Sequence, residues 1–184
     1  RATDFQDVQI IDPNGVIVIS ASPLNIGKSQ FEQPFFIEGQ TKTFTQGFYE
    51  SDLFGKTTLT VATPLFDDRN KRIGVLALHF NLRQVDSIIR EVQDLNEPIQ
   101  SYLITRDRKI ITDDPLILVQ YPEMNSSAID LALDGGEGIS SYINHDGEAV
   151  IGRYLAIENQ NAILIVEIDE ETALRPARRL ALNI

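Results

Sequence analysis

An approximate internal repeat is the feature that most constrains the fold of this chain. A short apolar strand, a polar turn and a second apolar strand occupy residues 9–19, and the same order returns at residues 102–111. Each half also closes on a similar apolar strand, at 75–80 and at 163–168, after nearly the same length of chain. Self-similarity in order and spacing is the signature of a repeated structural unit. The sequence therefore predicts two copies of one β-sheet unit.

The two opening hairpins align residue by residue. The alignment pairs Ile10 with Leu103, Ile11 with Ile104, Asn14 with Asp107 and Ile17 with Ile110. The first hairpin turns at 12–15, Asp-Pro-Asn-Gly, where proline presets φ and glycine adopts positive φ readily. A further hairpin in the second copy turns at Asp146-Gly147, a strong two-residue turn signal. Tight turns of this kind join antiparallel strands, so we expect antiparallel sheets.

Apolar runs bounded by turn residues predict the remaining elements. We expect strands at 8–11, 16–19, 48–50, 57–63 and 73–80 in the first copy, and at 102–104, 109–111, 139–143, 149–155 and 163–168 in the second. Helices are expected at 82–94, where Asn81 is an N-cap candidate, and after Asp169. Residues 31–47 fit neither period, and we expect a semi-ordered segment whose aromatic side chains cover the sheet.

The predicted fold class is therefore α+β. It consists of two units, at 1–95 and 96–184, and each contains an antiparallel sheet of about five strands flanked by helices.

Composition and charge exclude several classes of function. The net charge is −11, whereas a nucleic-acid surface needs clustered Lys and Arg, which occur only at 175–179. The chain has no cysteine, which excludes disulfides and cysteine metal sites. No apolar run approaches the roughly 20 residues that span a bilayer. We expect no nucleic-acid partner.

Enzymatic chemistry finds little support in the sequence. The chain has two histidines, His79 and His145, and Ser29, Ser126 and Ser127 have no histidine nearby in sequence to form a nucleophile–base pair. His145 lies in an expected turn, where a lone histidine is usually solvated. No glycine-rich phosphate loop matches a known pattern. We expect no catalytic residue, and a hydrolase with an unfamiliar site is the enzymatic alternative.

Three acidic runs are candidate cation ligands: Asp67-Asp68, Asp113-Asp114 and Asp169-Glu170-Glu171. Carboxylates in turns and at helix N-termini accept backbone hydrogen bonds or complement the helix dipole, which explains these runs more simply. We therefore expect no metal and no cofactor.

Three stretches together share their order and spacing with a known family. They are the opening hairpin, then Pro34–Phe36 followed by Gly47–Tyr49 and Gly55–Pro64, and finally Arg72–Leu82. Through these stretches nearly the whole chain resembles the double Cache family, the paired PAS-like sensor ectodomains of bacterial chemoreceptors, histidine kinases and cyclases. The resemblance implies a membrane-distal PAS-like unit at 1–95 and a membrane-proximal one at 96–184, which ends in a helix.

The resemblance also implies where a ligand binds. In amino-acid-binding members the distal unit uses an arginine for the ligand carboxylate and an aspartate for its ammonium, beside aromatic residues. Here these positions hold Gln33 and His79, and a neutral amide cannot replace a bidentate guanidinium. The ligand-binding residues implied are Phe35, Phe36, Tyr49, Thr58, Thr60 and His79. They favour a neutral or weakly anionic small organic molecule, with His79 as a donor that titrates near neutral pH. Plain core packing is the alternative for the phenylalanines and for His79.

The function implied is that of the extracytoplasmic ligand-sensing domain of a bacterial transmembrane receptor. The distal unit would bind the small molecule, and the proximal unit would relay the change to a cytoplasmic output domain such as a histidine kinase or a cyclase. The resemblance places the domain at the cell membrane, on its periplasmic or extracellular side, with flanking transmembrane helices and a homodimeric full-length receptor. The alternative is a structural or interaction module of the same fold that binds no ligand.

Overall fold

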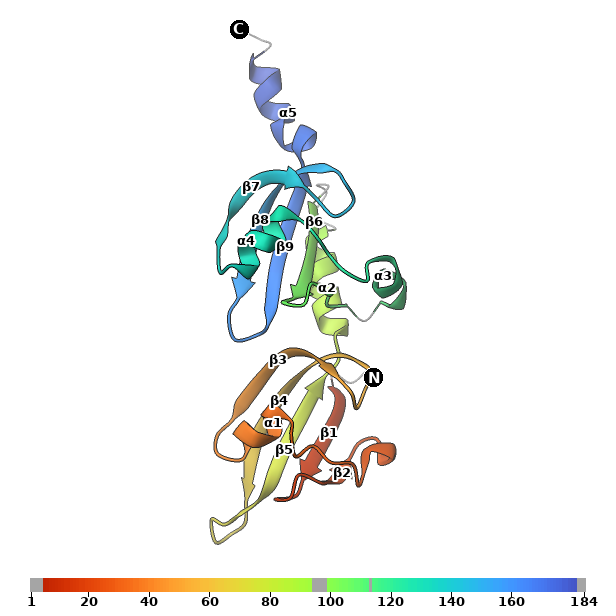
Figure 1. Cartoon of the computed structure of the whole chain (residues 1–184), viewed down its shortest axis with the longest axis vertical. Helices are drawn as coiled ribbons and strands as arrows, with labels where there is room; N and C mark the ends of the chain where they lie inside the picture. The colour runs from red at the N-terminus through yellow and green to blue at the C-terminus, as the bar shows by residue number, and fades with distance from the viewer. Residues whose placement is uncertain (1–4, 94–98, 113, 182–184) are drawn as a thin grey trace. The chain divides into compact units, whose positions relative to one another are not determined.

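The computed structural model describes residues 5–93, 99–112 and 114–181 (Figure 1). The chain divides into two compact units, Arg1–Leu82 and Arg83–Ile184. The boundary expected between residues 95 and 96 lies outside the described residues. Helix α2 (Arg83–Gln93) groups with the second unit, where it packs on strand β6 (Ile99–Thr105).

The first unit is a five-stranded antiparallel sheet with the order β2-β1-β5-β4-β3 (Figure 1). The strands are β1 (Phe5–Ile11), β2 (Ile17–Ser20), β3 (Phe44–Ser51), β4 (Lys56–Phe66) and β5 (Arg72–Phe80). A 3-10 turn at Pro23–Asn25 follows β2, and helix α1 (Pro34–Gly39) packs on β3, β4 and β5. The core of this unit is formed by Ile11, Ile17, Phe35, Phe36, Ala62, Val75 and Ala77.

In its described residues, the second unit repeats this plan with one strand fewer. Its antiparallel order is β6-β9-β8-β7, with β7 (Glu137–Ile143), β8 (Ala149–Ile157) and β9 (Ala162–Asp169). Helix α4 (Ser127–Leu133) packs on β7, β8 and β9, as α1 does on β3, β4 and β5. Helix α5 (Glu170–Ala181) follows β9 directly. The fold class expected from the sequence is confirmed.

Strand register confirms the internal repeat. Four cross-strand pairs occupy equivalent places in the two sheets: Ile10–Leu76 with Leu103–Leu164, and Ile11–Ile17 with Ile104–Ile110. These are the residues that the sequence alignment matches. Strands β1, β3, β4 and β5 therefore correspond to β6, β7, β8 and β9.

The expected strand at 109–111 is wrong, because this segment is reduced to the isolated bridge at Ile110. The chain turns away into helix α3 (Pro115–Gln120), which begins soon after the bridge. Asp114 caps this helix, with its carboxylate accepting from the Leu116 N–H at 2.9 Å, and proline occupies the first turn. Among the described residues, the second sheet therefore has no counterpart of β2.

The expectation of a semi-ordered segment at 31–47 is also wrong, because it contains α1 and the start of β3. Helices α1, α3 and α4 have six or seven residues each, which is less than two turns. An apolar stripe cannot repeat within so short a helix, so the hydrophobic period gave no signal.

The acidic runs serve local structure where they are described. Asp67 accepts from two backbone N–H groups of its turn, and Asp169 accepts from the Thr172 N–H at the start of α5. Asp113 lies outside the described residues. In the part of the chain that the structure describes, no group of three or more His, Asp or Glu side chains is placed to hold a metal ion.

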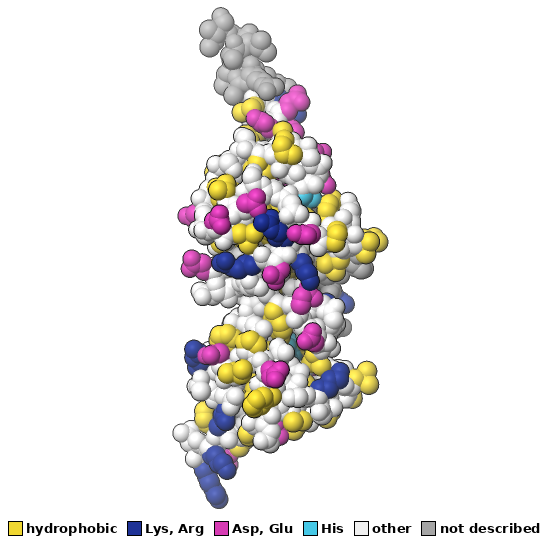
Figure 2. All heavy atoms as spheres, in the orientation of Figure 1, with side chains coloured by type: hydrophobic (Ala, Val, Ile, Leu, Met, Phe, Trp, Pro, Cys, Tyr) yellow, Lys and Arg dark blue, Asp and Glu magenta, His cyan; other side chains and the backbone are white. Residues whose placement is uncertain are grey.

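Among the described helices, none combines the length and the apolar character needed to cross a bilayer. Exposed hydrophobic side chains gather over α3, where Leu116 and Val119 are 78% and 82% exposed (Figure 2).

Candidate functional site

One face of the first sheet is polar although it is buried. Asp7 and Gln9 on β1, Thr58 and Thr60 on β4, and His79 on β5 are all at most 1% exposed. Alternate residues of a strand share a face, and the register places Asp7 opposite His79 and His79 opposite Thr60. A sheet face packed only for stability would carry apolar residues here. This row of buried polar groups marks the first candidate site.

His79 lies at the centre of that row and joins a chain of hydrogen bonds. The Thr60 hydroxyl is 2.8 Å from His79 Nδ1 and 2.9 Å from the Tyr49 hydroxyl. The other ring nitrogen, Nε2, is buried and has no hydrogen-bond partner among the described residues. Buried polar atoms in native proteins are nearly always paired, so an unpaired Nε2 points to a missing partner.

Gln9 offers a second unpaired atom on the same face. Its Nε2 donates to the Asp7 carboxylate at 2.9 Å, which fixes the orientation of the amide and leaves Oε1 buried without a described partner. Gln9 and His79 are diagonal neighbours on adjacent strands, a spacing of about 7–8 Å between such positions. An acceptor and an imidazole nitrogen therefore flank the same small region.

Asp7 cannot serve as a ligand partner, because both of its oxygens are occupied. One oxygen accepts from backbone N–H groups at residues 8, 21 and 22. The other accepts from Gln9, Ser20 and Asn25. Burial raises the pKa of Asp7, but these hydrogen bonds together outweigh it and hold the pKa below its usual value. Asp7 is a structural carboxylate that ties β1 to the segment after β2.

Four of the six expected site residues are joined by direct contacts: Tyr49, Thr60 and His79 by hydrogen bonds, and Phe35, which packs edge-on against the His79 ring with centroids 5.2 Å apart. Phe36 is buried in the core, and its ring pairs with that of Phe31. Thr58 donates to the Phe80 carbonyl at 2.9 Å, which leaves it a local structural role. Phe54, which the sequence did not single out, closes on His79 with ring centroids 5.0 Å apart. Gln33 is the N-cap residue of α1 without a side-chain cap bond.

The protonation expected for His79 needs correction. Burial lowers the pKa of His79 to about 4, and the nearby Asp7 carboxylate opposes this only in part. The imidazole is therefore neutral at neutral pH and does not titrate there. Burial also raises the pKa of the Tyr49 hydroxyl, so the whole chain from Tyr49 to His79 is uncharged.

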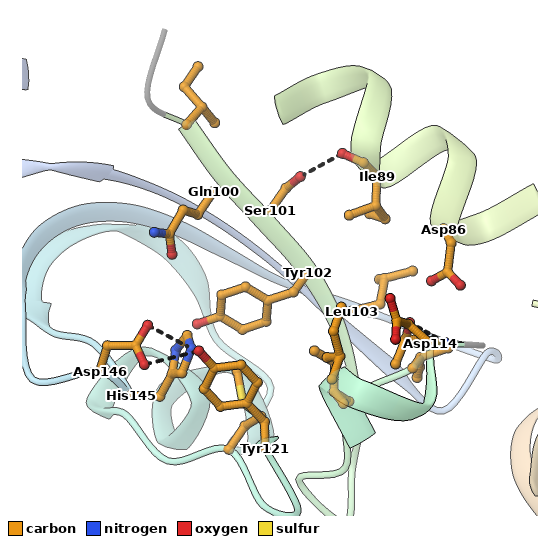
Figure 3. Close-up of a pocket in the computed structure, with 16 residues that line it drawn as sticks. Asp86, Ile89, Gln100, Ser101, Tyr102, Leu103, Asp114, Tyr121, His145 and Asp146 are labelled. Atoms are coloured by element: carbon orange, nitrogen blue, oxygen red, sulfur yellow. Dashed lines mark hydrogen bonds and ion pairs between the residues drawn. The ribbon is translucent and has the colours of Figure 1, made fainter. Parts of the chain in front are cut away.

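The second unit contains a cavity of about 600 Å³, and none of the six expected residues lines it (Figure 3). It lies where α2, β6, the segment before α3 and the Asp146 turn meet. Its walls include Tyr102, Tyr121, His145 and the carboxylates of Asp86, Asp114 and Asp146. No sequence motif marks this cavity, because its walls come from separate elements.

Behind Tyr102 lies a buried carboxylate. Glu167 is 1% exposed, and its Oε1 accepts from the hydroxyls of Tyr102 at 2.8 Å and Tyr142 at 2.7 Å. Its Oε2 is buried with no hydrogen-bond partner among the described residues. Burial, together with the hydrogen bonds and charge of Glu167, raises the pKa of both tyrosines, so they remain protonated donors.

Glu167 and His79 occupy equivalent places in the repeat. His79 lies three residues after Leu76, and Glu167 lies three residues after Leu164. Each of these leucines pairs with the opening strand of its unit. The tyrosines Tyr49 and Tyr142 also correspond. Tyr49 lies opposite Thr58, two residues before the Thr60 that faces His79. Tyr142 lies opposite Val150, two residues before the Gly152 that faces Glu167. Both units thus place a tyrosine-linked polar group on the same buried strand position.

The sequence indicated that His145 is a solvated turn residue, and this prediction is wrong. Its side chain is 9% exposed and lies between Tyr102 and Tyr121, with ring centroids 5.3 and 4.9 Å away. Its Nε2 is 3.3 Å from Asp146 Oδ2, and its buried Nδ1 has no partner among the described residues. The aromatic neighbours come from distant parts of the sequence, so only the fold reveals this burial.

A comparison with known families identifies the family of this chain. The model of the Cache domain family matches residues 1–177. The chain belongs to the Cache domain family. Cache domains are non-catalytic ligand-binding modules that act as extracellular or periplasmic sensor domains of membrane receptors.

Solved structures share the fold of this Cache domain at low sequence identity. An extracellular ligand binding receptor from Desulfohalobium retbaense has 18% identity and a TM-score of 0.67, covering 90% of this chain and 30% of that one. The sensor domain of the V. cholerae histidine kinase DctB has 13% identity and a TM-score of 0.62, covering 90% of this chain and 72% of that one.

The ligand binding domain of the Pseudomonas aeruginosa amino acid chemoreceptor PctB, in complex with L-Arg, has 17% identity and a TM-score of 0.59, covering 98% of this chain and 72% of that one. No curated protein sequence matches this Cache domain.

Proposed function

We propose that this Cache domain is the extracytoplasmic ligand-sensing part of a bacterial transmembrane receptor, and that its first unit binds a small organic molecule. The observation that supports this most is the pair of unpaired atoms His79 Nε2 and Gln9 Oε1 on one buried sheet face. Leaving buried polar atoms unpaired costs about 1–3 kcal/mol each, which a bound ligand would recover. A purely structural module has no reason to retain both.

The site favours a neutral or weakly anionic ligand that carries a hydroxyl or amide N–H. Gln9 Oε1 accepts only, so it needs a donor from the ligand. The residues assigned to the site offer an α-amino acid zwitterion no charged partner, because Asp7 is already saturated and residues 2–68 contain no arginine. Desolvating both of its charges without partners costs several kcal/mol per ion. Ligands of PctB-like relatives are therefore poor candidates for this site.

In the receptor, the first unit would be membrane-distal and the second unit membrane-proximal. A ligand seated between Phe35, Phe54 and His79 would change the packing of α1 on the sheet. The second unit would pass that change through α5 to a flanking transmembrane helix and a cytoplasmic output domain such as a histidine kinase or cyclase. The full-length receptor would work as a homodimer.

A ligand screen by thermal unfolding tests this function. The panel contains hydroxy acids, short carboxylates, amides and the twenty amino acids, and a ligand at about 100 times its Kd adds about 2.7 kcal/mol of stability. Hits should lose affinity in Thr60→Val, which removes the hydroxyl between Tyr49 and His79. Thr63→Val is the matched control, since Thr63 bonds Thr43 on the exposed face of the same strand.

Three outcomes would contradict the proposal. Hits that Thr60→Val and His79→Phe leave unchanged would bind elsewhere. A micromolar amino-acid ligand that depends on His79 would show that the site pairs both charges through residues not identified above. Absence of any stabilising compound across the panel would favour the structural-module alternative.

A further inference from the structure

The second unit has its own recess, and its charge differs from that of the first. Sixteen described residues line the 600 Å³ cavity, and among these sixteen three are aspartates and none is Lys or Arg (Figure 3). Such a volume lies within the range of small-molecule sites, about 300–1,000 Å³. The carboxylate of Asp146 in this described wall favours a positively charged ligand group.

The aromatic side chains of the cavity point to an organic cation. His145 makes edge-to-face pairs with both Tyr102 and Tyr121 along one wall (Figure 3). Tyrosine rings attract ammonium groups through their quadrupole. The remaining walls are largely apolar, with Ile89, Leu103 and Ile117 among them. A hydrated inorganic ion gains nothing from apolar walls. An amine with a hydrocarbon body can place its ammonium group against the aromatic and carboxylate wall and its hydrocarbon part against the apolar wall.

An unpaired acceptor lies in the same wall. His145 Nε2 faces Asp146 Oδ2 at 3.3 Å, which in the neutral ring places the proton on Nε2 and leaves Nδ1 as an acceptor. This Nδ1 is buried, in a side chain that is 9% exposed, and has no partner among the described residues. An ammonium N–H is a suitable donor to it. The second oxygen of the buried Glu167 behind Tyr102 adds negative potential.

We infer that the cavity of the second unit is a second ligand site, which binds a primary amine with an apolar or aromatic body. The ammonium lies among Asp146, His145 and Tyr121, and the hydrocarbon part lies along α2 and β6. The site arises from the missing counterpart of β2, because the chain after Ile110 forms a loop and α3 that wall a cavity instead of a strand.

Isothermal titration of the whole chain with three probes of similar shape tests the inference: 2-phenylethylamine, 2-phenylethanol and 3-phenylpropanoate. The amine should bind about tenfold or more tightly than the alcohol, and the carboxylate should not bind. Asp146→Asn should weaken the amine about tenfold and leave the alcohol unchanged. Asp134→Asn, the same change at an exposed carboxylate outside the cavity, should have no effect.

Gln100→Lys supplies an independent test, because it adds a cation at an exposed position in the cavity wall. It should abolish amine binding and admit 3-phenylpropanoate. Equal affinity for the three probes, or an unchanged amine affinity in both Asp146→Asn and Gln100→Lys, would overturn the inference. Amine binding that is lost in His79→Phe but kept in Asp146→Asn would place the amine in the first unit, which also overturns it. Ligand binding in the first unit is tested separately, by the loss of affinity in Thr60→Val, so the two proposals can fail independently.

Discussion

The hydroxyl of Tyr142 occupies the space that a side chain at Gly152 would fill. Gly152 lies opposite Glu167, as Thr60 lies opposite His79 in the first unit. The threonine hydroxyl there stands between a tyrosine and the buried polar group, whereas glycine lets Tyr142 reach Glu167 directly at 2.7 Å. The residue at this one position therefore decides whether the tyrosine bonds the buried group through a threonine hydroxyl or directly.

Gly152→Ala should therefore destabilise the second unit. The added methyl displaces the Tyr142 ring and breaks its bond to Glu167, and overpacking of this kind costs about 1–3 kcal/mol. Urea unfolding followed by circular dichroism measures the loss. In a Tyr142→Leu background the same substitution should cost less, and a double-mutant cycle with no coupling would contradict the steric account.

Glu167→Ala should destabilise more than Glu167→Gln. The alanine variant leaves the buried hydroxyls of Tyr102 and Tyr142 without an acceptor, at about 1–3 kcal/mol for each. Glutamine keeps an acceptor oxygen in the same place. Denaturant unfolding of the two variants against the wild type provides the comparison, and equal losses would show that the two hydroxyls find other partners.

The stability that depends on His79 should fall with acid. Its pKa is about 4 in the folded chain and 6.5 in the unfolded chain, so the unfolded state binds the proton first as the pH drops. The stabilisation is complete above pH 6.5 and is lost as the pH falls towards 4, by at most about 3 kcal/mol at about 1.4 kcal/mol per pKa unit.

Unfolding free energies of the wild type and His79→Gln, measured across this pH range, check the effect. Other titrating groups contribute equally to both proteins and cancel in the difference. The advantage of the wild type should shrink as the pH falls. A difference that stays constant with pH would mean that the imidazole is more solvated than its burial indicates.

Asp7→Asn should destabilise the first unit strongly. The carboxylate accepts hydrogen bonds from three backbone N–H groups and three side chains. In asparagine an NH2 group replaces one oxygen, and because it is itself a donor it cannot accept the hydrogen bonds that this oxygen receives. A loss of about 3 kcal/mol or more is expected for such a buried network. Asp52→Asn, at an exposed carboxylate of the same unit, is the control and should change little.

The sequence predicted the sheets well because a strand repeats its pattern every two residues. The alignment of Ile11 with Ile104 and of Ile17 with Ile110 matches the observed pairs in both units. The short helices were missed because fewer than two turns carry no stripe. Their capping residues, such as Ser126 before α4, were the available signal.

Site residues could be predicted only at positions that the resemblance to the Cache family covers. His79, Tyr49 and Thr60 were singled out from the strands that carry them, and the structure joins them by hydrogen bonds. Asp7 and Gln9 were missed, because alternating polar residues at the edge of an apolar run look solvent-exposed. The cavity of the second unit is assembled from segments far apart in the chain, so no local pattern indicates it.

The absence of a β2 counterpart in the second unit has a consequence for how the two units diverge over evolution. A wall made of sheet hydrogen bonds restricts change, because an insertion or a proline there breaks the ladder. The wall formed by residues 111, 112 and 114–124 is loop and one short helix, which accept insertions and substitutions far more readily. Descendants of this chain can therefore acquire new chemical preferences in the second unit while the paired strands that hold both sheets together stay the same.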